Sequence, residues 1–266
     1  YAASRGEYLN GKVIAAYLGF PFVDAAEVIF FQPDGSLNDE KTEKVLRERL
    51  SGLENAVIPG FYGCGADGYV KTFSRGGSDV TGSIVAGAVK ASLYENWTDV
   101  SGFLVADPRI VDDPAVIRTI TYTELRELSY MGASVLHEAA IFPVRSAGIP
   151  INIRNTNAPD EPGTMIVPDS TDEELSAYTI TGIAGKKDFT SINIHKDLMN
   201  SQIGFCRDVL NVLSEHQIPL EHMPSSIDSM TVIVDSAHLN GLEDEIRTEI
   251  IKQYSRTASK QRTVLR

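Results

Sequence analysis

The chain has 266 residues, of which 42% are hydrophobic and 23% are charged, and its formal net charge is −12. This balance is typical of a soluble globular protein, and the negative charge excludes a broad surface for nucleic acid or anionic membrane, because phosphate binding needs clustered cations. No apolar run reaches about 18 residues, and no signal-peptide pattern opens the chain, so we expect a cytoplasmic protein.

Two helices are predicted first. One should start at Ser4, because Ser4–Glu7 has the Ser-x-x-Glu pattern of a capping box. Leu9, Val13 and Tyr17 then fall on one face of that helix. The second helix should span about residues 39–53, where apolar residues recur at helical spacing.

Short apolar or alternating segments predict the strands of the first section. These segments are 55–62, 69–73, 96–100 and 149–155. Helical patterns separate them at 80–93 and 121–148, and the second pattern breaks around Gly132. Alternation of strands and helices predicts a layered α/β domain with a mainly parallel sheet.

The composition changes near residue 167. The segment "VPDSTDEEL" is acidic, contains proline and has no apolar period, so we place a linker at 168–177. Beyond it, the patterns predict a strand at 189–195, a helix around Phe205–Leu213, strands at 218–224 and 229–235, and a helix at 242–253. This β-α-β-β-α order is most of a ferredoxin-like sandwich, whose last strand would have to come from the tail.

Three possible site motifs fail on their context. "GCGADG" at 63–68 has the glycine spacing of a dinucleotide site, but a strand pattern follows it where a helix is required, so we predict a glycine-rich hairpin. Gly77–Ser83 has P-loop spacing, but Ser83 stands where that motif needs lysine. The cysteines, Cys64 and Cys206, and the five histidines show no metal-ligand spacing, so no metal site is predicted.

"SRGGSD" at 74–79 is the most suggestive stretch. Gly76 and Gly77 would let backbone N–H groups approach a ligand at a helix amino terminus, and Arg75 could grip a carboxylate or phosphate. Asp79 would repel a simple anion, but it would suit the ammonium group of an amino acid. The alternative is a glycine turn capped by Ser78 or Asp79.

"TDVSGFLVADPR" at 98–109 ends a predicted strand with polar residues. Ligands bind at the carboxyl ends of parallel strands, so Thr98, Asp99 and Arg109 are candidates. The alternative is an Asx-type turn followed by a surface arginine.

Together these stretches resemble the aspartate kinases of the amino acid kinase fold. The match is carried by "SRGE", "TFSRGGSDVTG", "NWTDVSGFLVADPRIV", "ELSYMGASVLHEAAIFPVRSAGIPINIRNT" and "PGTMI". Their order and spacing agree over residues 1–167, and residues 178–266 look like the first of that family's two ACT regulatory domains. The resemblance implies a three-layer α/β/α sandwich followed by a ferredoxin-like ACT domain.

The resemblance implies an activity: transfer of the ATP γ-phosphoryl group, with Mg²⁺, to the side-chain carboxylate of L-aspartate, at the start of lysine, threonine and methionine synthesis. By motif, Arg75 would hold a substrate carboxylate, and Glu7 and Asp79 would face the substrate ammonium. The backbone of Gly76, Gly77 and Ser78 would line the pocket. Nucleotide contacts would come from Thr98, Asp99, Leu104, Asp107, Arg109 and Ser134.

The resemblance also implies feedback control by an inhibitory amino acid, lysine or threonine, in a homodimer or higher oligomer. Its site would include Met199, Gln202, Glu221, Ser225 and Ser226. Relatives begin with a Lys-x-Gly-Gly strand and end with a second ACT domain, and this chain shows neither, so we expect it to be an internal portion of a longer enzyme that is inactive without the lysine. The competing hypothesis is an amino-acid-binding regulatory module without phosphotransfer.

Overall fold

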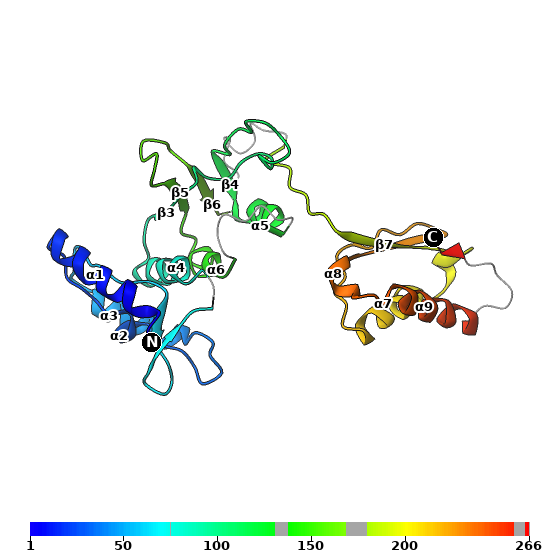
Figure 1. Cartoon of the computed structure of the whole chain (residues 1–266), viewed down its shortest axis with the longest axis horizontal. Helices are drawn as coiled ribbons and strands as arrows, with labels where there is room; N and C mark the ends of the chain where they lie inside the picture. Colours follow the sequence, from blue (N-terminus) through cyan, green and yellow to red (C-terminus); the bar gives the residue numbers. More distant parts are fainter. Residues whose placement is uncertain (75, 131–137, 169–179, 258–263, 266) are drawn as a thin grey trace. The chain divides into compact units, whose positions relative to one another are not determined.

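The computed structural model describes residues 1–74, 76–130, 138–168, 180–257 and 264–265. Contacts divide the chain into two compact units, Tyr1–Gly185 and Lys186–Arg266 (Figure 1). The predicted linker lies outside the described residues except at its first residue, Pro168. Residues 180–185 are tied to the first unit, since the backbone N–H of Ile183 donates to the carbonyl of Val105 at 2.7 Å.

Helix α1 (Ser4–Leu18) begins where the sequence predicts, but the capping box is wrong. Ser4 is itself helical, and its hydroxyl donates to the carbonyl of Tyr1 at 2.7 Å instead of capping the helix. The predicted apolar face at Leu9, Val13 and Tyr17 is exposed. The helix packs through its small residues instead, because a Cβ added at Gly11 would meet Pro59 at 3.3 Å.

The larger sheet among the described residues of the first unit is mixed. Its strands are β3 (Tyr94–Thr98), β4 (Thr119–Thr121), β5 (Ile151–Asn155) and β6 (Thr164–Val167), in the order β3-β5-β6-β4. The pairs β3/β5 and β4/β6 are parallel, and β5/β6 is antiparallel. The remaining helices are α2 (Ala25–Val28), α3 (Asp39–Leu50), α4 (Gly77–Val89), α5 (Tyr122–Tyr130) and α6 (Glu138–Ser146). Figure 1 shows α4 and α6 side by side, and α3 also contacts α4.

The segment 55–62 does not form the predicted strand. Within it only Val57 makes a bridge, to Phe22, and β1 (Tyr62–Cys64) begins at its end. β1 pairs antiparallel with β2 (Val70–Thr72), so the glycine motif at 63–68 is a hairpin, as predicted. The N–H of Gly65 closes this turn by donating to the carbonyl of Tyr69 at 2.7 Å.

Thr164 anchors the loop that precedes β4. Its buried hydroxyl accepts from the N–H of Phe103 at 2.8 Å and donates to the carbonyl of Ile117 at 2.6 Å. Both ends of the 103–117 segment are therefore fixed to β6. Gly102 has a φ of 114°, and a Cβ there would lie 2.2 Å from the Thr164 hydroxyl oxygen, so only glycine fits.

Tyr122 provides a test of core burial. Burial raises the pKa of Tyr122 to about 12, although Arg145 lowers it. In the unfolded chain tyrosine has a pKa near ~10. The raised pKa of folded Tyr122 therefore contributes to the free energy of unfolding in full below pH ~10. This contribution is lost as the pH rises from ~10 toward 12. By pH ~11 this loss should reach ~1.4 kcal/mol. The free energy of unfolding in urea should therefore fall between neutral and alkaline pH by more in wild type than in Tyr122→Phe. Equal pH dependence in the two proteins would contradict this expectation.

The second unit is built on an antiparallel sheet. Its strands are β7 (Phe189–His195), β8 (Ser229–Asp235) and β9 (Val264–Leu265), in the order β8-β7-β9, so the tail supplies a strand as predicted. The predicted strand at 218–224 is wrong as a regular strand. His222 and Ser225 make only isolated bridges to β8. Pro219 and Pro224 lack the N–H that a regular ladder needs.

Helices complete the second unit. They are η2 (Met199–Ser201), α7 (Phe205–Glu215), α8 (Ser236–Leu239) and α9 (Glu243–Thr257). Helices α7 and α9 pack on each other over a core that contains Val209, Val212 and Ile246. Among the described residues of the chain, no helix is long and apolar enough to cross a bilayer.

Candidate active site

The amino terminus of α4 is shaped by two glycines. Gly76 is the N-cap residue with a left-handed φ of 56°, which glycine adopts without strain. Gly77 is buried, and a Cβ there would lie 2.9 Å from both the Phe61 Cα and the Phe73 Cβ. The helix start therefore presses against the backbone of the segment before β1. Arg75 lies outside the described residues.

Asp79 is held by a side-chain cluster from β3. The Asn96 amide donates to its carboxylate at 3.0 Å and to the Tyr94 hydroxyl at 3.1 Å. The Tyr94 hydroxyl donates to the Asp79 carbonyl at 3.2 Å. Burial raises the pKa of Tyr94, and the Asp79 charge adds to this, so Tyr94 acts as a neutral donor. Neither Ser78 nor Asp79 caps the helix, because the N-cap residue is Gly76, which makes no side-chain cap bond.

The same face of β3 leads from Asp79 to the carboxyl edge of the sheet. Side chains alternate along a strand, so Tyr94, Asn96 and Thr98 share one face. A strand rises about 3.3 Å per residue, which places Thr98 on the order of 7 Å beyond Asn96. The acidic group at the start of α4 and the polar strand end therefore line one surface.

The carboxyl edge gathers polar groups from β3 and β5. Thr98 pairs with Asn155 in the parallel ladder, and its hydroxyl donates to the Asp99 carboxylate at 3.2 Å. The Thr156 hydroxyl and N–H both donate to the Thr98 carbonyl. The Asn155 amide donates to the Ser101 hydroxyl at 2.9 Å. This edge carries hydroxyl, amide and carboxylate groups, which can form hydrogen bonds with the hydroxyls of a sugar.

Three further predicted residues lie in the following loop. Leu104 is half-buried and bridges to Val116, which closes the base of the loop. Asp107 accepts two-pronged hydrogen bonds from the Arg109 guanidinium, at 3.0 Å and 2.6 Å. The Asp107 carboxylate raises the pKa of Arg109. The Arg109 N–H also donates to the Asp107 carboxylate at 2.8 Å, and the Arg109 side chain is 85% exposed, so an Asx-type turn with a surface arginine is present, as the alternative predicted.

Glu7 is exposed on the first turn of α1. Its helix rests on the segment that also supports α4, since Gly11 packs on Pro59 and a Cβ at Gly60 would lie 3.0 Å from the Ser78 Cα. One short segment therefore positions both Glu7 and the start of α4. Ser134 lies outside the described residues.

The predicted effector residues all lie in the second unit, in two separate segments of the chain. Met199 is buried in η2, and Gln202 follows it directly. The Asn200 N–H donates to the carbonyl of Ile227 at 3.1 Å, which joins this loop to the turn that carries Ser225 and Ser226. The Glu221 N–H donates to Ile233, so it lies along the edge of β8.

The sequence did not single out Tyr94 or Asn96. Their signal was the alternation along β3, which places every second residue on the face that Thr98 occupies. Asn155 and Thr156 were also missed, although they follow the neighbouring strand β5 directly.

Residues 1–155 match the model of the amino acid kinase family. The chain belongs to this family. Aspartokinase 3 of Bacillus subtilis is 42% identical over 247 residues, which are 89% of this chain and 53% of that protein. The family resemblance predicted from the sequence motifs is thereby confirmed, and the α/β fold with it.

Solved structures agree with this family fold. A crystal structure of Clostridium acetobutylicum aspartate kinase has a TM-score of 0.83 and 54% identity, over 100% of this chain and 60% of that one. Escherichia coli aspartokinase III, crystallised with lysine and aspartate, has a TM-score of 0.67 at 23% identity, over 99% of this chain and 60% of that one, and supports the fold alone. The chain spans about half the length of the curated relatives it matches.

Proposed function

We propose that this amino acid kinase chain is part of an aspartate kinase, which transfers the ATP γ-phosphoryl group to the side-chain carboxylate of L-aspartate. The observation that carries the proposal is the Asp79–Asn96 contact on the face of β3 that ends at Thr98 and Asp99. An amino acid substrate and a nucleotide could bind next to each other along that face. The similarity to aspartokinases over most of the chain supports this choice of acceptor.

The chemistry requires positioning more than proton transfer. A carboxylate acceptor with a pKa near ~4 is ionised at neutral pH, so no general base is needed. The Asp79 carboxylate, oriented by Asn96, would bind the substrate ammonium together with Glu7. Arg75 would bind the substrate carboxylate, and the N–H groups of Gly77 and Ser78 at the start of α4 would line the pocket. The acceptor oxygen then points toward the carboxyl edge of β3.

The nucleotide would bind along that edge. Thr98 and Asp99 would meet the nucleoside, while Leu104, Asp107, Arg109 and Ser134 would surround the rest of it. Mg²⁺ prefers oxygen ligands and is usually held by substrate phosphates with one or two carboxylates. In the described part of the first unit, no group of three metal-ligating side chains converges. The ion would arrive with the nucleotide and neutralise phosphoryl charge, with exposed Asp99 available as a protein ligand.

We also propose that the second unit is a regulatory ACT domain. Its strand order, with segment 221–225 beside β8, follows the β-α-β-β-α-β pattern of a ferredoxin-like sandwich. An inhibitory amino acid, lysine or threonine, would bind between η2 and the 221–226 segment. The protein would act as a cytoplasmic homo-oligomer at the start of lysine, threonine and methionine synthesis.

Glu221→Ala should blunt feedback inhibition without abolishing turnover. Glu221 lies along the edge of β8 in the second unit, whereas the proposed chemistry lies in the first. In the full-length protein we expect at least a tenfold rise in the half-inhibitory effector concentration, equivalent to ~1.4 kcal/mol of binding energy. Steady-state kinetics with lysine and threonine would measure it. Loss of turnover with inhibition intact would contradict the division of roles.

Trapping the product tests the proposed reaction. An acyl phosphate reacts with hydroxylamine, so the full-length protein with ATP, Mg²⁺ and L-aspartate should yield the aspartyl side-chain hydroxamate and ADP. ATP-independent binding of amino acids without hydroxamate would favour the regulatory-module alternative instead. The similarity to named aspartokinases does not favour that alternative.

A further inference from the structure

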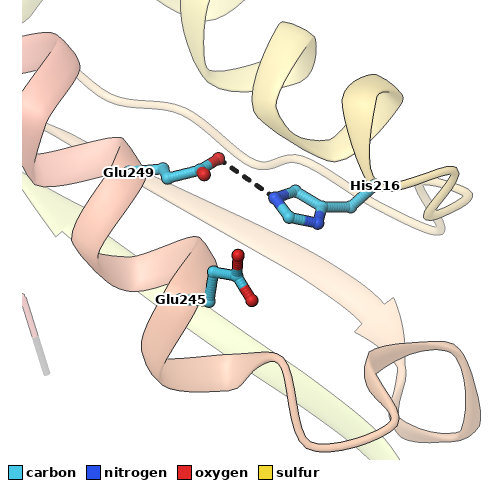
Figure 2. A group of neighbouring side chains, drawn as sticks. All are labelled: His216, Glu245 and Glu249. Carbon is cyan, nitrogen blue, oxygen red and sulfur yellow. Dashed lines mark hydrogen bonds and ion pairs between the residues drawn. The ribbon is translucent and has the colours of Figure 1, made fainter.

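Three potential metal ligands converge where α7 meets α9. They are His216, which directly follows α7, and Glu245 and Glu249 on α9. Each offers one ligand atom, and these atoms all lie within 4.8 Å of one another. Figure 2 shows the His216 ring and both carboxylates directed toward the same space between the helices. Within the described part of the chain, this is the one group of three such side chains that converges.

The backbone holds His216 in place. Gln217 adopts a left-handed φ of 57°, and the Ile218 N–H donates to the Leu213 carbonyl at 2.9 Å. This backbone arrangement terminates α7 directly before His216. Leu213 and Ile218 are both buried. The imidazole is therefore presented from a fixed helix end, with only 18% of its side chain exposed.

Helix α9 presents the two carboxylates together. Glu245 and Glu249 are four residues apart, so they lie one above the other on the helix surface. Each directly precedes a buried core residue, Ile246 and Ile250, which fixes the rotation of the helix. Both glutamates consequently flank the packed interface with α7.

We propose that His216, Glu245 and Glu249 bind a divalent transition-metal ion, with Zn²⁺ as the expected ion. His216 Nε2 lies 3.0 Å from the Glu249 carboxylate, which is a hydrogen-bond distance. Zinc bonds of about 2.0–2.2 Å place tetrahedral ligands roughly 3.4 Å apart, so small side-chain rotations would suffice. Zinc would take the place of this hydrogen bond and leave one position for water. An imidazole ligand disfavours Mg²⁺ and Ca²⁺.

Glu245 distinguishes this site from a simple ion pair. A His–Glu pair across two helices needs only His216 and Glu249, whereas a three-ligand site also needs the exposed Glu245. No sequence pattern indicated this group, because His216 is far from the glutamates in the chain. This inference is independent of the proposed kinase activity.

Zinc titration of the 266-residue chain tests the proposal. We expect one Zn²⁺ per chain by calorimetry and an absorption band of tetrahedral Co²⁺. Glu245→Gln and His216→Ala should each weaken Zn²⁺ binding at least tenfold, or ~1.4 kcal/mol. Glu243→Gln on the same helix and His195→Ala on β7 are the matched controls and should bind as wild type does.

Thermal unfolding gives a second readout. Zn²⁺ should raise the Tm of wild type and of both controls more than that of Glu245→Gln. His216→Asn replaces His216→Ala if the alanine variant does not fold. Absence of saturable zinc binding would overturn the proposal. Wild-type zinc affinity in Glu245→Gln would also overturn it, because His216 and Glu249 alone would then account for the binding.

Discussion

Asp79→Ala should lower kcat/KM for L-aspartate by at least about 100-fold in the full-length protein. The carboxylate is held by Asn96 and aimed from the start of α4, where it would bind the substrate ammonium. Without it, a bound ammonium group loses its charge partner. The KM for ATP should stay unchanged, because the nucleotide would bind beyond Thr98. Coupled assays of ADP release with each substrate varied would measure both.

Matched variants separate this role from general effects of charge. Asp67→Ala removes an exposed carboxylate from the β1–β2 hairpin and should leave the kinetics unchanged. Asn96→Ala removes the group that orients Asp79 and should show an intermediate loss in kcat/KM for aspartate. If Asp79→Ala and Asp67→Ala behave alike, the assignment of Asp79 to the substrate is wrong.

Gly77→Ala should destabilise the first unit by ~3 kcal/mol, the upper end of the cost of overpacking. The added Cβ would lie 2.9 Å from a backbone carbon of Phe61, and backbone cannot move aside as a flexible side chain can. The start of α4 would have to shift, which would also displace Asp79 from Asn96. Denaturant unfolding monitored by circular dichroism would measure the change.

Gly87→Ala is the matched control on the same helix. A Cβ there meets nothing closer than 3.6 Å, at the carbonyl oxygen of Pro143. Alanine is the better helix former by up to ~1 kcal/mol, so this variant should be as stable as wild type or more stable. Equal stability of Gly77→Ala and Gly87→Ala would show that the close approach at the start of α4 is not real.

Much of the fold follows from local sequence patterns. The helix start at Ser4, the hairpin at 63–68 and strand β3 were predicted because periodicity and glycine spacing act over a few residues. The capping box failed because the helix continues one residue further back, to Ser4 itself. Periodicity gives a helix its faces but does not tell which face is buried, as the exposed Leu9 and Tyr17 show.

Long-range partners were beyond the sequence patterns. Asp79 was singled out from its motif, but its contact with Asn96 joins a helix to a strand 17 residues away. The grouping of His216 with Glu245 and Glu249 likewise depends on how α7 packs on α9. Such pairings are decided by packing in three dimensions, and no local spacing encodes them.

Discrimination between L-aspartate and succinate tests the central claim most directly. Succinate has both carboxylates of aspartate but lacks the ammonium group that Asp79 would bind. In the full-length protein, wild type should prefer aspartate by at least about 100-fold in kcat/KM, and Asp79→Ala should lose most of that preference. An undiminished preference in Asp79→Ala would contradict the account, because the ammonium group would then be recognised elsewhere.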